Sequence, residues 1–261
     1  MGLIDENHVY SYTQLSSVSE CPFGFYLSRI EKAEQQSNGF AEQGTLIHDL
    51  LDRWAKGELT KEQLPDEYAR RYPDEVVTKF PRMLAAKGYA EKAYNLGIEY
   101  FTNFDEFAGY TIVATEERFE TELEGRPFVG IIDMILRDDL TGELIILDHK
   151  SKSLAAFKNS EDEMYRQQLL YAKYVHEKYG QWPDRLMFNL FKEGGKKMER
   201  RFSQDDYDAA IAWAVQQIQK IEEYDILEWL ECKDPNFFCK EICSVRKHCP
   251  NGIAKPAAKR K

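Results

Sequence analysis

The sequence predicts an α+β protein in which helices flank a central mixed β-sheet. Five segments rich in apolar and β-branched residues are expected to be strands: 111–123, 127–137, 143–149, 185–192 and 197–202. A helical segment at about 161–179 separates the third strand from the fourth, and such a crossover joins parallel neighbours of one sheet. Short turns join the other consecutive strands, which favours antiparallel pairing. One sheet is therefore expected to contain both kinds of pairing.

Capping residues and apolar spacing predict the helices of the N-terminal third. The first begins at Ser11 or Thr13 and runs toward Cys21, and an aromatic-rich second covers 23–30. A third, at 42–56, carries one apolar stripe made of Leu46, Ile47, Leu50, Leu51 and Trp54. We expect this stripe to pack against the sheet.

Prolines dominate the segment that follows. Pro65, Pro73 and Pro81 predict a loop-rich stretch over 57–82, and a long helix is expected from 83 to 107. Together they would form a helical insertion at about 57–107.

The last helix is predicted to begin at Ser203, because Ser203 and Asp206 have the spacing of a capping box, and to run to about 224. The hairpin before it would turn at Glu193-Gly194-Gly195. We expect one domain over 1–250, with a cysteine-rich segment at 232–250 and a basic flexible tail at 251–261.

Composition indicates a globular chain with a sizeable core. Of its 261 residues 43% are hydrophobic and 31% are charged, and no apolar run is long enough to span a bilayer. The N-terminus lacks the features of a signal peptide, so we expect a cytoplasmic protein. A formal net charge of −10 argues against a protein that coats nucleic acid. Residues 148–201 nevertheless hold twelve Lys or Arg against eight Asp or Glu, which is compatible with a local phosphate track.

The residues with the clearest chemistry are two aspartates and a lysine on neighbouring predicted strands. Asp148 and Lys150 stand at i and i+2, so they share one face of their strand. Pairing with the preceding strand can bring Asp133 to the same place. Two carboxylates and an ammonium group suit a hard divalent cation and a phosphodiester.

The alternative is that both aspartates only end their strands as turn residues. Asp138, Asp139 and Gly142 already supply the chemistry of the turn. Asp133 lies within the apolar run 131–135, where an unpaired carboxylate is costly to bury. A bound metal ion would remove that cost.

Further polar residues occur in a fixed order around these three. Gly44 and His48 lie on the 42–56 helix, Gly130 precedes Asp133, and Gln167 and Tyr171 stand at i and i+4 on the helix after Lys150. Individually each is weak, since a lone histidine on an apolar face is more often a core residue. In this order they resemble the PD-(D/E)XK nuclease superfamily, in particular its RecB-like exonuclease branch. The resemblance covers about residues 10–250.

The resemblance implies an α/β/α, restriction-endonuclease-like fold and a metal-dependent nuclease. Asp133, Asp148, the backbone carbonyl of His149 and the imidazole of His48 would bind Mg²⁺ or Mn²⁺. Lys150 would orient the attacking water or stabilise the developing charge.

Two further assignments follow from the resemblance. Gln167 and Tyr171 would position the DNA strand or hold the catalytic lysine. An additional upstream acid would be Glu116 or Glu117, and the sequence does not choose between them.

Four of the five cysteines lie in the last thirty residues. The Cys21-Pro22 element resembles that of RecB-like nucleases that contain an iron–sulfur cluster, such as AddB-type and CRISPR-associated enzymes. The resemblance implies that Cys21, Cys239, Cys243 and Cys249 hold a 4Fe-4S cluster that joins the two ends of the domain. The first C-terminal gap is one residue longer than usual. The alternatives are a zinc site that uses Cys232 in place of Cys21, and free thiols.

We therefore expect a DNA exonuclease that acts on single strands or DNA ends in recombination, repair or phage DNA metabolism. A helicase or recombination protein is a possible partner, no membrane is involved, and a prokaryotic or phage origin is favoured. The second hypothesis is a non-catalytic subunit that binds DNA ends, and the third is an RNA nuclease. The chain has no Gly-x4-Gly-Lys-Ser/Thr motif, so ATP hydrolysis is not expected of it.

Overall fold

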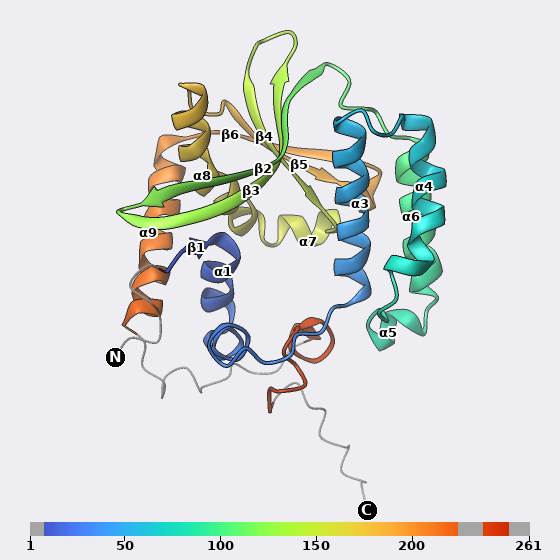
Figure 1. Cartoon of the computed structure of the whole chain (residues 1–261), viewed down its shortest axis with the longest axis horizontal. Coiled ribbons are helices and arrows are strands. Elements are labelled where there is room, and N and C mark those ends of the chain that lie inside the picture. Colours follow the sequence, from blue (N-terminus) through green and yellow to red (C-terminus); the bar gives the residue numbers. More distant parts are fainter. Residues whose placement is uncertain (1–7, 224–236, 251–261) are drawn as a thin grey trace, which may run out of the picture.

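The computed structural model describes residues 8–223 and 237–250. Six strands in this part of the chain form one mixed sheet (Figure 1). They are β1 (Tyr10–Ser11), β2 (Tyr110–Leu123), β3 (Arg126–Asp138), β4 (Leu144–Lys150), β5 (Arg185–Leu190) and β6 (Lys196–Arg201). Strand β4 is parallel to β5 and antiparallel to β3, so the prediction of a mixed sheet is confirmed.

Strand β3 is the centre of this sheet because three strands pair with it. Along one edge it pairs with β2 over almost its whole length. Elsewhere it pairs with β1 at Phe128 and Val129, and with β4 from Met134 to Arg137. The residues of β3 between these two pairings, from Gly130 to Asp133, have no partner in either β1 or β4. The candidate site lies at this interruption.

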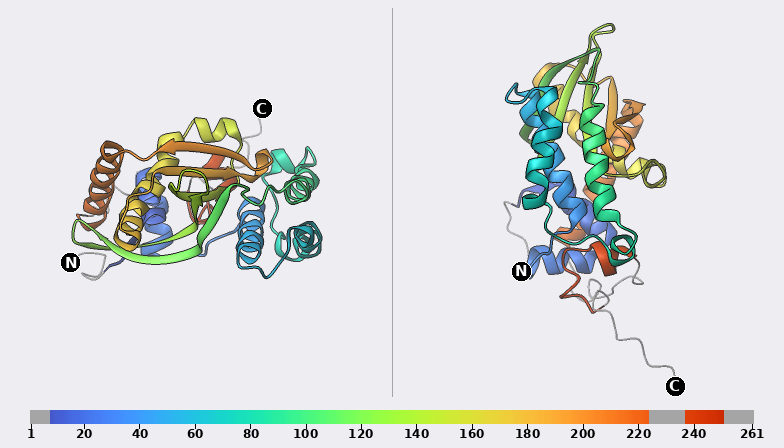
Figure 2. Two further views of the ribbon diagram at one scale, coloured as in Figure 1. Left: turned by 90° about the horizontal axis from the view of Figure 1, so that it is seen from above. Right: turned by 90° about the vertical axis from the view of Figure 1, so that its right-hand side faces the viewer.

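Helices cover both faces of the sheet (Figures 1 and 2). On one face lie α3 (Gly39–Ala55), α4 (Leu64–Glu75) and α6 (Tyr89–Thr102), and on the other α1 (Tyr12–Glu20), α8 (Glu161–Tyr179) and α9 (Gln204–Glu222). Among the described helices none is long and apolar enough to cross a membrane.

Strand β4 shows how the sheet separates its two cores. Leu144 and Ile146 are buried in the core beneath α8 and α9, whereas Ile145 and Leu147 are buried in the core beneath α3 and α6. The period of two then places Asp148 and Lys150 on the side of α8 and His149 on the side of α3. The end of β4 therefore presents different chemistry to each helical layer.

The prediction of a loop-rich stretch over 57–82 was wrong. Helix α4 occupies Leu64–Glu75 of it. Pro65 is tolerated because it lies in the first turn, where a backbone N–H has no helical partner, and Pro73 lies in the last turn. Leu64 and Tyr68 of this helix are fully buried, so tertiary packing overrides the proline signal.

The single helix expected over 83–107 is also interrupted. A short α5 (Arg82–Ala85) precedes α6, and Gly88 between them has a φ of 70°, a left-handed conformation that glycine adopts easily. The last predicted helix ends at Glu222, close to its expected end near residue 224, which lies outside the described part of the chain.

Several short elements were not predicted, because each is too brief to show periodicity. They are β1, α7 (Leu154–Lys158), the 3-10 turns η2 (Lys61–Gln63) and η3 (Phe191–Glu193), and the π-helical turn η4 (Phe238–Ile242). The helix predicted over 23–30 is present as α2 (Pro22–Phe25) followed by the π-helical turn η1 (Tyr26–Ile30).

The two ends of the described chain meet below the sheet. Phe23 and Leu27 pack with Val245 and Cys249 in a small apolar cluster. The backbone N–H of Gln36 donates to the carbonyl of Ser244 at 2.8 Å. This contact joins segments more than two hundred residues apart in the sequence.

We predict that Gly130→Ala destabilises the fold. A Cβ atom at this position of β3 would lie 2.5 Å from the Phe119 ring and 2.8 Å from the Tyr171 ring. Both rings are buried and cannot move freely, so we expect a loss of about 1–3 kcal/mol in the free energy of unfolding, measured by denaturant titration. Gly44→Ala is the matched control, since a Cβ there meets nothing within 4 Å and should stabilise α3 by about 0.5–1 kcal/mol. Equal stability of the two variants would contradict this packing.

Candidate active site

Asp133 lies where β3 and β4 stop pairing. The last registered pair of these strands is Met134 with Leu147. One residue further on, Oδ2 of Asp133 accepts a hydrogen bond from the backbone N–H of His149 at 2.8 Å. The carboxylate thus replaces the missing partner in the ladder and is held at the strand end.

Asp148 and Lys150 lie side by side, as their spacing predicted. The Nζ atom of Lys150 is 2.9 Å from Oδ1 and 2.8 Å from Oδ2 of Asp148. Burial, together with the nearby charge of Asp133, raises the pKa of Asp148 to about 6 against the pull of Lys150. Burial opposes the charge on Lys150, but Asp148 and Asp133 outweigh it and raise the pKa of the ammonium group. Lys150 is therefore held as a cation beside two carboxyl groups.

Gln167 and Tyr171 extend this pair from α8. Lys150 donates to Oε1 of Gln167 at 3.3 Å, and Nε2 of Gln167 donates to the hydroxyl of Tyr171 at 3.1 Å. The i, i+4 spacing brings the two side chains of the helix together, as the sequence indicated.

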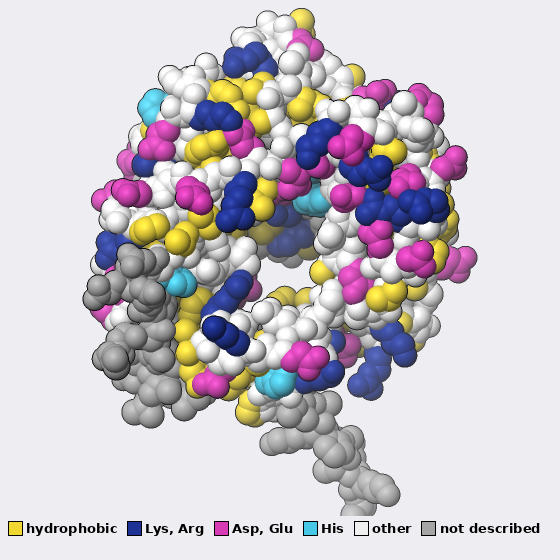
Figure 3. Space-filling view, in the orientation of Figure 1, with side chains coloured by type: hydrophobic (Ala, Val, Ile, Leu, Met, Phe, Trp, Pro, Cys, Tyr) yellow, Lys and Arg dark blue, Asp and Glu magenta, His cyan; other side chains and the backbone are white. Residues whose placement is uncertain are grey.

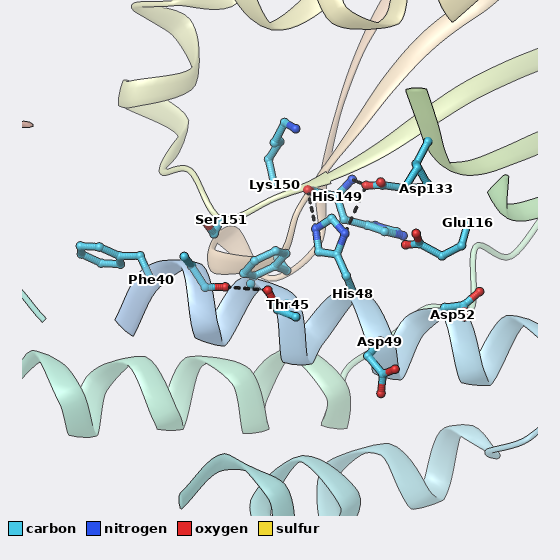
Figure 4. A pocket seen from close by; sticks show the side chains of 14 residues that line it. Phe40, Thr45, His48, Asp49, Asp52, Glu116, Asp133, His149, Lys150 and Ser151 are labelled. Carbon is cyan, nitrogen blue, oxygen red and sulfur yellow. Dashed lines mark hydrogen bonds and ion pairs between the residues drawn. The ribbon is translucent and has the colours of Figure 1, made fainter. Parts of the chain in front are cut away.

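His48 approaches the strand end from α3, on the opposite face of the sheet (Figure 4). Its Nε2 lies 2.9 Å from the carbonyl oxygen of His149, and its Nδ1 lies 3.4 Å from Oδ2 of Asp133. A carbonyl only accepts, so Nε2 of His48 carries a proton, and Nδ1 is the ring atom that faces Asp133. A histidine that binds a metal usually donates its other N–H in this way.

The side chain of His149 is buried on the α3 side of the sheet, where its ring lies beside that of His48. Its Nδ1 accepts from the amide of Asn189 at 3.0 Å, since an amide nitrogen only donates. Burial lowers the pKa of His149 to about 3, so its ring is neutral. The residue therefore contributes backbone groups to the site, in keeping with the expectation that its carbonyl and not its ring is the functional group.

The structure distinguishes between Glu116 and Glu117. Ligand atoms of His48, Glu116 and Asp133 all lie within 4.8 Å of one another. Glu117 is directed to α8, where Lys178, Tyr174 and Tyr179 bind it. A register shift in β2 between Ile112 and Ala114 and a φ of 44° at Glu116 set this choice. Strained non-glycine backbone of this kind is concentrated at functional sites.

The chemistry of this group favours a cation. The carboxylates of Glu116 and Asp133 and the imidazole of His48 converge on one place. Burial and the charge of Asp133 raise the pKa of Glu116 to about 7, which shows that the site resists a further negative charge. Oxygen and imidazole ligands are those of Mg²⁺ and Mn²⁺ sites. These residues therefore fit a divalent metal ion.

A hollow of about 730 Å³ opens over these residues (Figure 4). Its lining includes Asp52 and Phe40, which sequence reasoning missed. Asp52 stands four residues after His48 on α3, a spacing that could have revealed it, and accepts from Thr115 at 3.0 Å. Asp49 also lines the hollow but pairs with Arg71 and points away from His48 in Figure 4.

The cysteines lie apart from this site, in the cluster where the chain ends meet. Cys21 caps α2, with its sulfur accepting the N–H of Gly24 at 3.3 Å, and Cys243 packs beside Cys249 and Cys21. Cys239 lies in η4, and Cys232 lies outside the described residues. Within the described chain no three cysteine sulfurs come within 4.8 Å of one another, so Cys239, Cys243 and Cys249 are not arranged around a single zinc ion.

Comparison with known proteins agrees with this fold. Residues 9–250 match the model of the PD-(D/E)XK nuclease superfamily, and the chain belongs to that superfamily.

Two relatives illustrate the similarity. The gene 69 protein of Mycobacterium phage D29 is 26% identical over 167 residues, which are 54% of this chain and 61% of that protein, so less than two thirds of the relative's length is matched. A crystal structure from Eubacterium rectale, of a protein provisionally named an exonuclease, aligns over 97% of this chain and 91% of that chain with a TM-score of 0.51. At 11% identity, that alignment demonstrates a shared fold.

We predict that Glu116 makes the stability of the metal-free protein depend on pH. Its folded pKa of about 7 lies above the ordinary value of 4.5, so the folded state holds a proton that the unfolded state releases. Glu116 therefore stabilises the folded state at low pH, and this contribution to the free energy of unfolding is lost as the pH rises through about 7. In EDTA, Glu116→Gln should raise the melting temperature at pH 8 and have a smaller effect at pH 5.

Glu117→Gln is the control for this prediction. Despite burial, hydrogen bonds with Lys178, Tyr174 and Tyr179 hold the pKa of Glu117 below its usual range. The Glu117 carboxylate therefore stabilises the folded state at pH values above that range. Its removal should lower the melting temperature at pH 8. The same direction of change for both variants would contradict the assignment.

Proposed function

We propose that this protein is a metal-dependent deoxyribonuclease, and more specifically an exonuclease that cleaves single-stranded DNA or DNA ends. The observation that carries the proposal is the convergence of His48, Glu116 and Asp133 within 4.8 Å, beside the Asp148–Lys150 ion pair. A nuclease needs a cation site and a positive group beside the phosphate, and both occur at the same strand end.

The metal ligands would be His48, Asp133, Asp148 and the carbonyl of His149, with Glu116 as an addition. When bound, Mg²⁺ or Mn²⁺ would activate a water and offset charge on the phosphate. The His48 ring is held for this role by its hydrogen bond to His149, and Asp133 by its bond from the His149 amide. Asp148 would reach the metal only by sharing its carboxylate with Lys150.

Lys150 would stabilise negative charge on the phosphate or orient the attacking water. Its Nζ is bound by Asp148 and Gln167, which fixes the ammonium group in one place. Tyr171 completes this series of hydrogen bonds by accepting one from Gln167. Gln167 and Tyr171 act in this account as positioning residues, and a preorganised charge of this kind is an effective way to lower a barrier.

The shape of the protein supports a single-stranded or end-specific substrate. Figure 3 shows an opening in the middle of one face, with Lys and Arg side chains around its rim. The hollow over the metal ligands is lined by residues of α3 and of the end of β4. We infer that a flexible single strand enters such an opening more readily than a duplex.

The setting we infer is cytoplasmic DNA recombination, repair or phage DNA metabolism, with a helicase or recombination protein as a potential partner. The similarity to a phage protein supports a phage or prokaryotic origin. The competing function is a subunit that binds DNA ends without cutting them. The presence of Asp133, Asp148 and Lys150 argues against it, because a non-catalytic protein would not need all three.

Cleavage of end-labelled DNA tests the proposal. The wild type should degrade single-stranded DNA with Mg²⁺ or Mn²⁺ and not in EDTA. Asp148→Ala should lower the rate at least a hundredfold while DNA binding persists, because the charge partner of Lys150 is lost. The control is Asp139→Asn in the β3–β4 hairpin, whose carboxylate accepts only from Thr111 among the described residues.

Each outcome has a defined meaning. Release of mononucleotides from one labelled end would identify an exonuclease and its polarity. Undiminished cleavage by pure Asp148→Ala would contradict the site assignment. DNA binding without cleavage by the wild type would instead favour the binding subunit, and preferential cleavage of RNA would redirect the substrate assignment.

We also propose that Cys21, Cys239, Cys243 and Cys249 hold a 4Fe-4S cluster. In support, Cys21, Cys243 and Cys249 share one apolar cluster, although they come from opposite ends of the chain. A four-iron cluster separates its cysteine sulfurs more widely than one zinc ion does, so it does not require three sulfurs as close together as a zinc site would. Its role would be to staple the chain ends.

Metal analysis tests this second proposal. Protein purified without oxygen should be brown and contain about four iron atoms per chain. Cys249→Ala should lose the iron and lower the melting temperature, whereas Cys232→Ala should retain both. Stoichiometric zinc, or iron that survives Cys249→Ala, would contradict the proposed ligand set.

A further inference from the structure

A second hollow, of about 320 Å³, lies beside the proposed catalytic site on the opposite side of Ile131. Ile131 lines both hollows, and 45% of its surface is exposed. The second hollow contains Arg118 of β2, Ser11 and Thr13 at the start of α1, and Gln167 and Tyr171 of α8. It occupies the interruption between the pairings of β1 and β4 with β3. No residue of the machinery proposed above explains Arg118.

The two hollows differ in chemistry. The lining of the first includes the four carboxylates of Asp49, Asp52, Glu116 and Asp133, together with Lys150 and two histidines. No carboxylate lines the second, and its charged side chain is an arginine. Within the described chain Arg118 forms no ion pair and no side-chain hydrogen bond, so its five N–H donors are available.

The hydrogen bonds from the catalytic lysine determine what Tyr171 can offer. An ammonium group only donates, so Lys150 must face Oε1 of Gln167, and Nε2 of Gln167 must then donate to the Tyr171 oxygen. The phenolic proton is left over, and no acceptor meets it in the part of the chain described. Tyr171 is 7% exposed and lines the second hollow. Its hydroxyl can therefore donate to an acceptor atom of a ligand in this hollow.

The hydroxyl groups of the first turn of α1 add to this set. Ser11 precedes the helix but its side chain makes no capping hydrogen bond. Thr13 has no side-chain partner among the described residues, and both line the hollow with Arg118. Three hydroxyls and a guanidinium, with no competing carboxylate, match the several oxygens of a phosphate group.

We propose that this second hollow binds a DNA phosphate next to the one that is cleaved, and that Arg118 is its principal ligand. The inference rests on the proposed nuclease function. The phosphate is either an internal phosphodiester or the terminal phosphate of the strand. A phosphate held here fixes the register of the DNA strand relative to Lys150, because the hydrogen bonds through Gln167 and Tyr171 join the two positions. Arg118 is thus a positioning and specificity residue.

Binding of single-stranded DNA in EDTA tests the inference separately from cleavage. The probes are oligonucleotides of one sequence with an internal fluorophore and a 5′-phosphate, a 3′-phosphate or only hydroxyl ends. Arg118→Gln should raise the dissociation constant roughly tenfold and reduce the salt slope by about 0.7, the value for one lost phosphate contact on a single strand. Arg118→Lys should retain the slope. Arg137→Gln, which removes an arginine bound only to the Gly142 carbonyl among described groups, is the control.

The outcomes separate the two sources of phosphate and the two proposals. If Arg118→Gln abolishes a wild-type preference for one phosphorylated end, the ligand is the terminal phosphate. Equal weakening for all three probes identifies an internal phosphodiester. Wild-type cleavage with Arg118→Gln equal to Arg137→Gln in affinity and salt slope overturns this inference alone. No binding and no cleavage by the wild type would overturn the nuclease function and this inference together.

Discussion

The hydrogen bond from the His149 amide to the Asp133 carboxylate is the contact on which the candidate site depends. It is 2.8 Å long and stands where the β3–β4 ladder would otherwise continue. By holding the two strand ends together, it directs the His149 carbonyl to His48 and places Asp133 near Asp148. It also concentrates negative charge, since Glu116 joins the same group. The ammonium group of Lys150 pairs with Asp148 and lines the same hollow. The mutual repulsion of these carboxylates makes the position suitable for a metal ion.

The interruption of the sheet gives this position access to both helical layers. His48 and Asp52 come from α3 on one face, and Gln167 and Tyr171 come from α8 on the other. A continuous sheet would keep these groups apart, because its side chains alternate between two faces. The two helical layers meet at the part of β3 that pairs with neither β1 nor β4. There Ile131 separates the hollow that contains the carboxylates from the hollow that contains hydrogen-bond donors. A metal and a phosphate chain can therefore lie next to each other.

Local spacing explains what the sequence could predict. The Asp148–Lys150 pair follows from a period of two, and the Gln167–Tyr171 contact follows from one helical turn. Helix α8 was predicted with its observed ends, Glu161 and Tyr179, because its capping and apolar signals agree. Approach of Asp133 to the same place required only that consecutive strands pair.

Features that depend on backbone irregularity or on distant packing could not be predicted. Glu116 and Glu117 are chemically equivalent in the sequence, and a register shift in β2 with a positive φ decides between them. Helix α4 was missed since its prolines resemble a loop, while burial of Tyr68 stabilises it.

The measurement that tests the central claim most directly is Mn²⁺ binding, followed by electron paramagnetic resonance, in the wild type and in Asp133→Asn. The account predicts specific binding by the wild type that is weakened at least tenfold in the variant, in line with loss of a charged ligand. Binding that is absent from the wild type, or equal in both proteins, would contradict it.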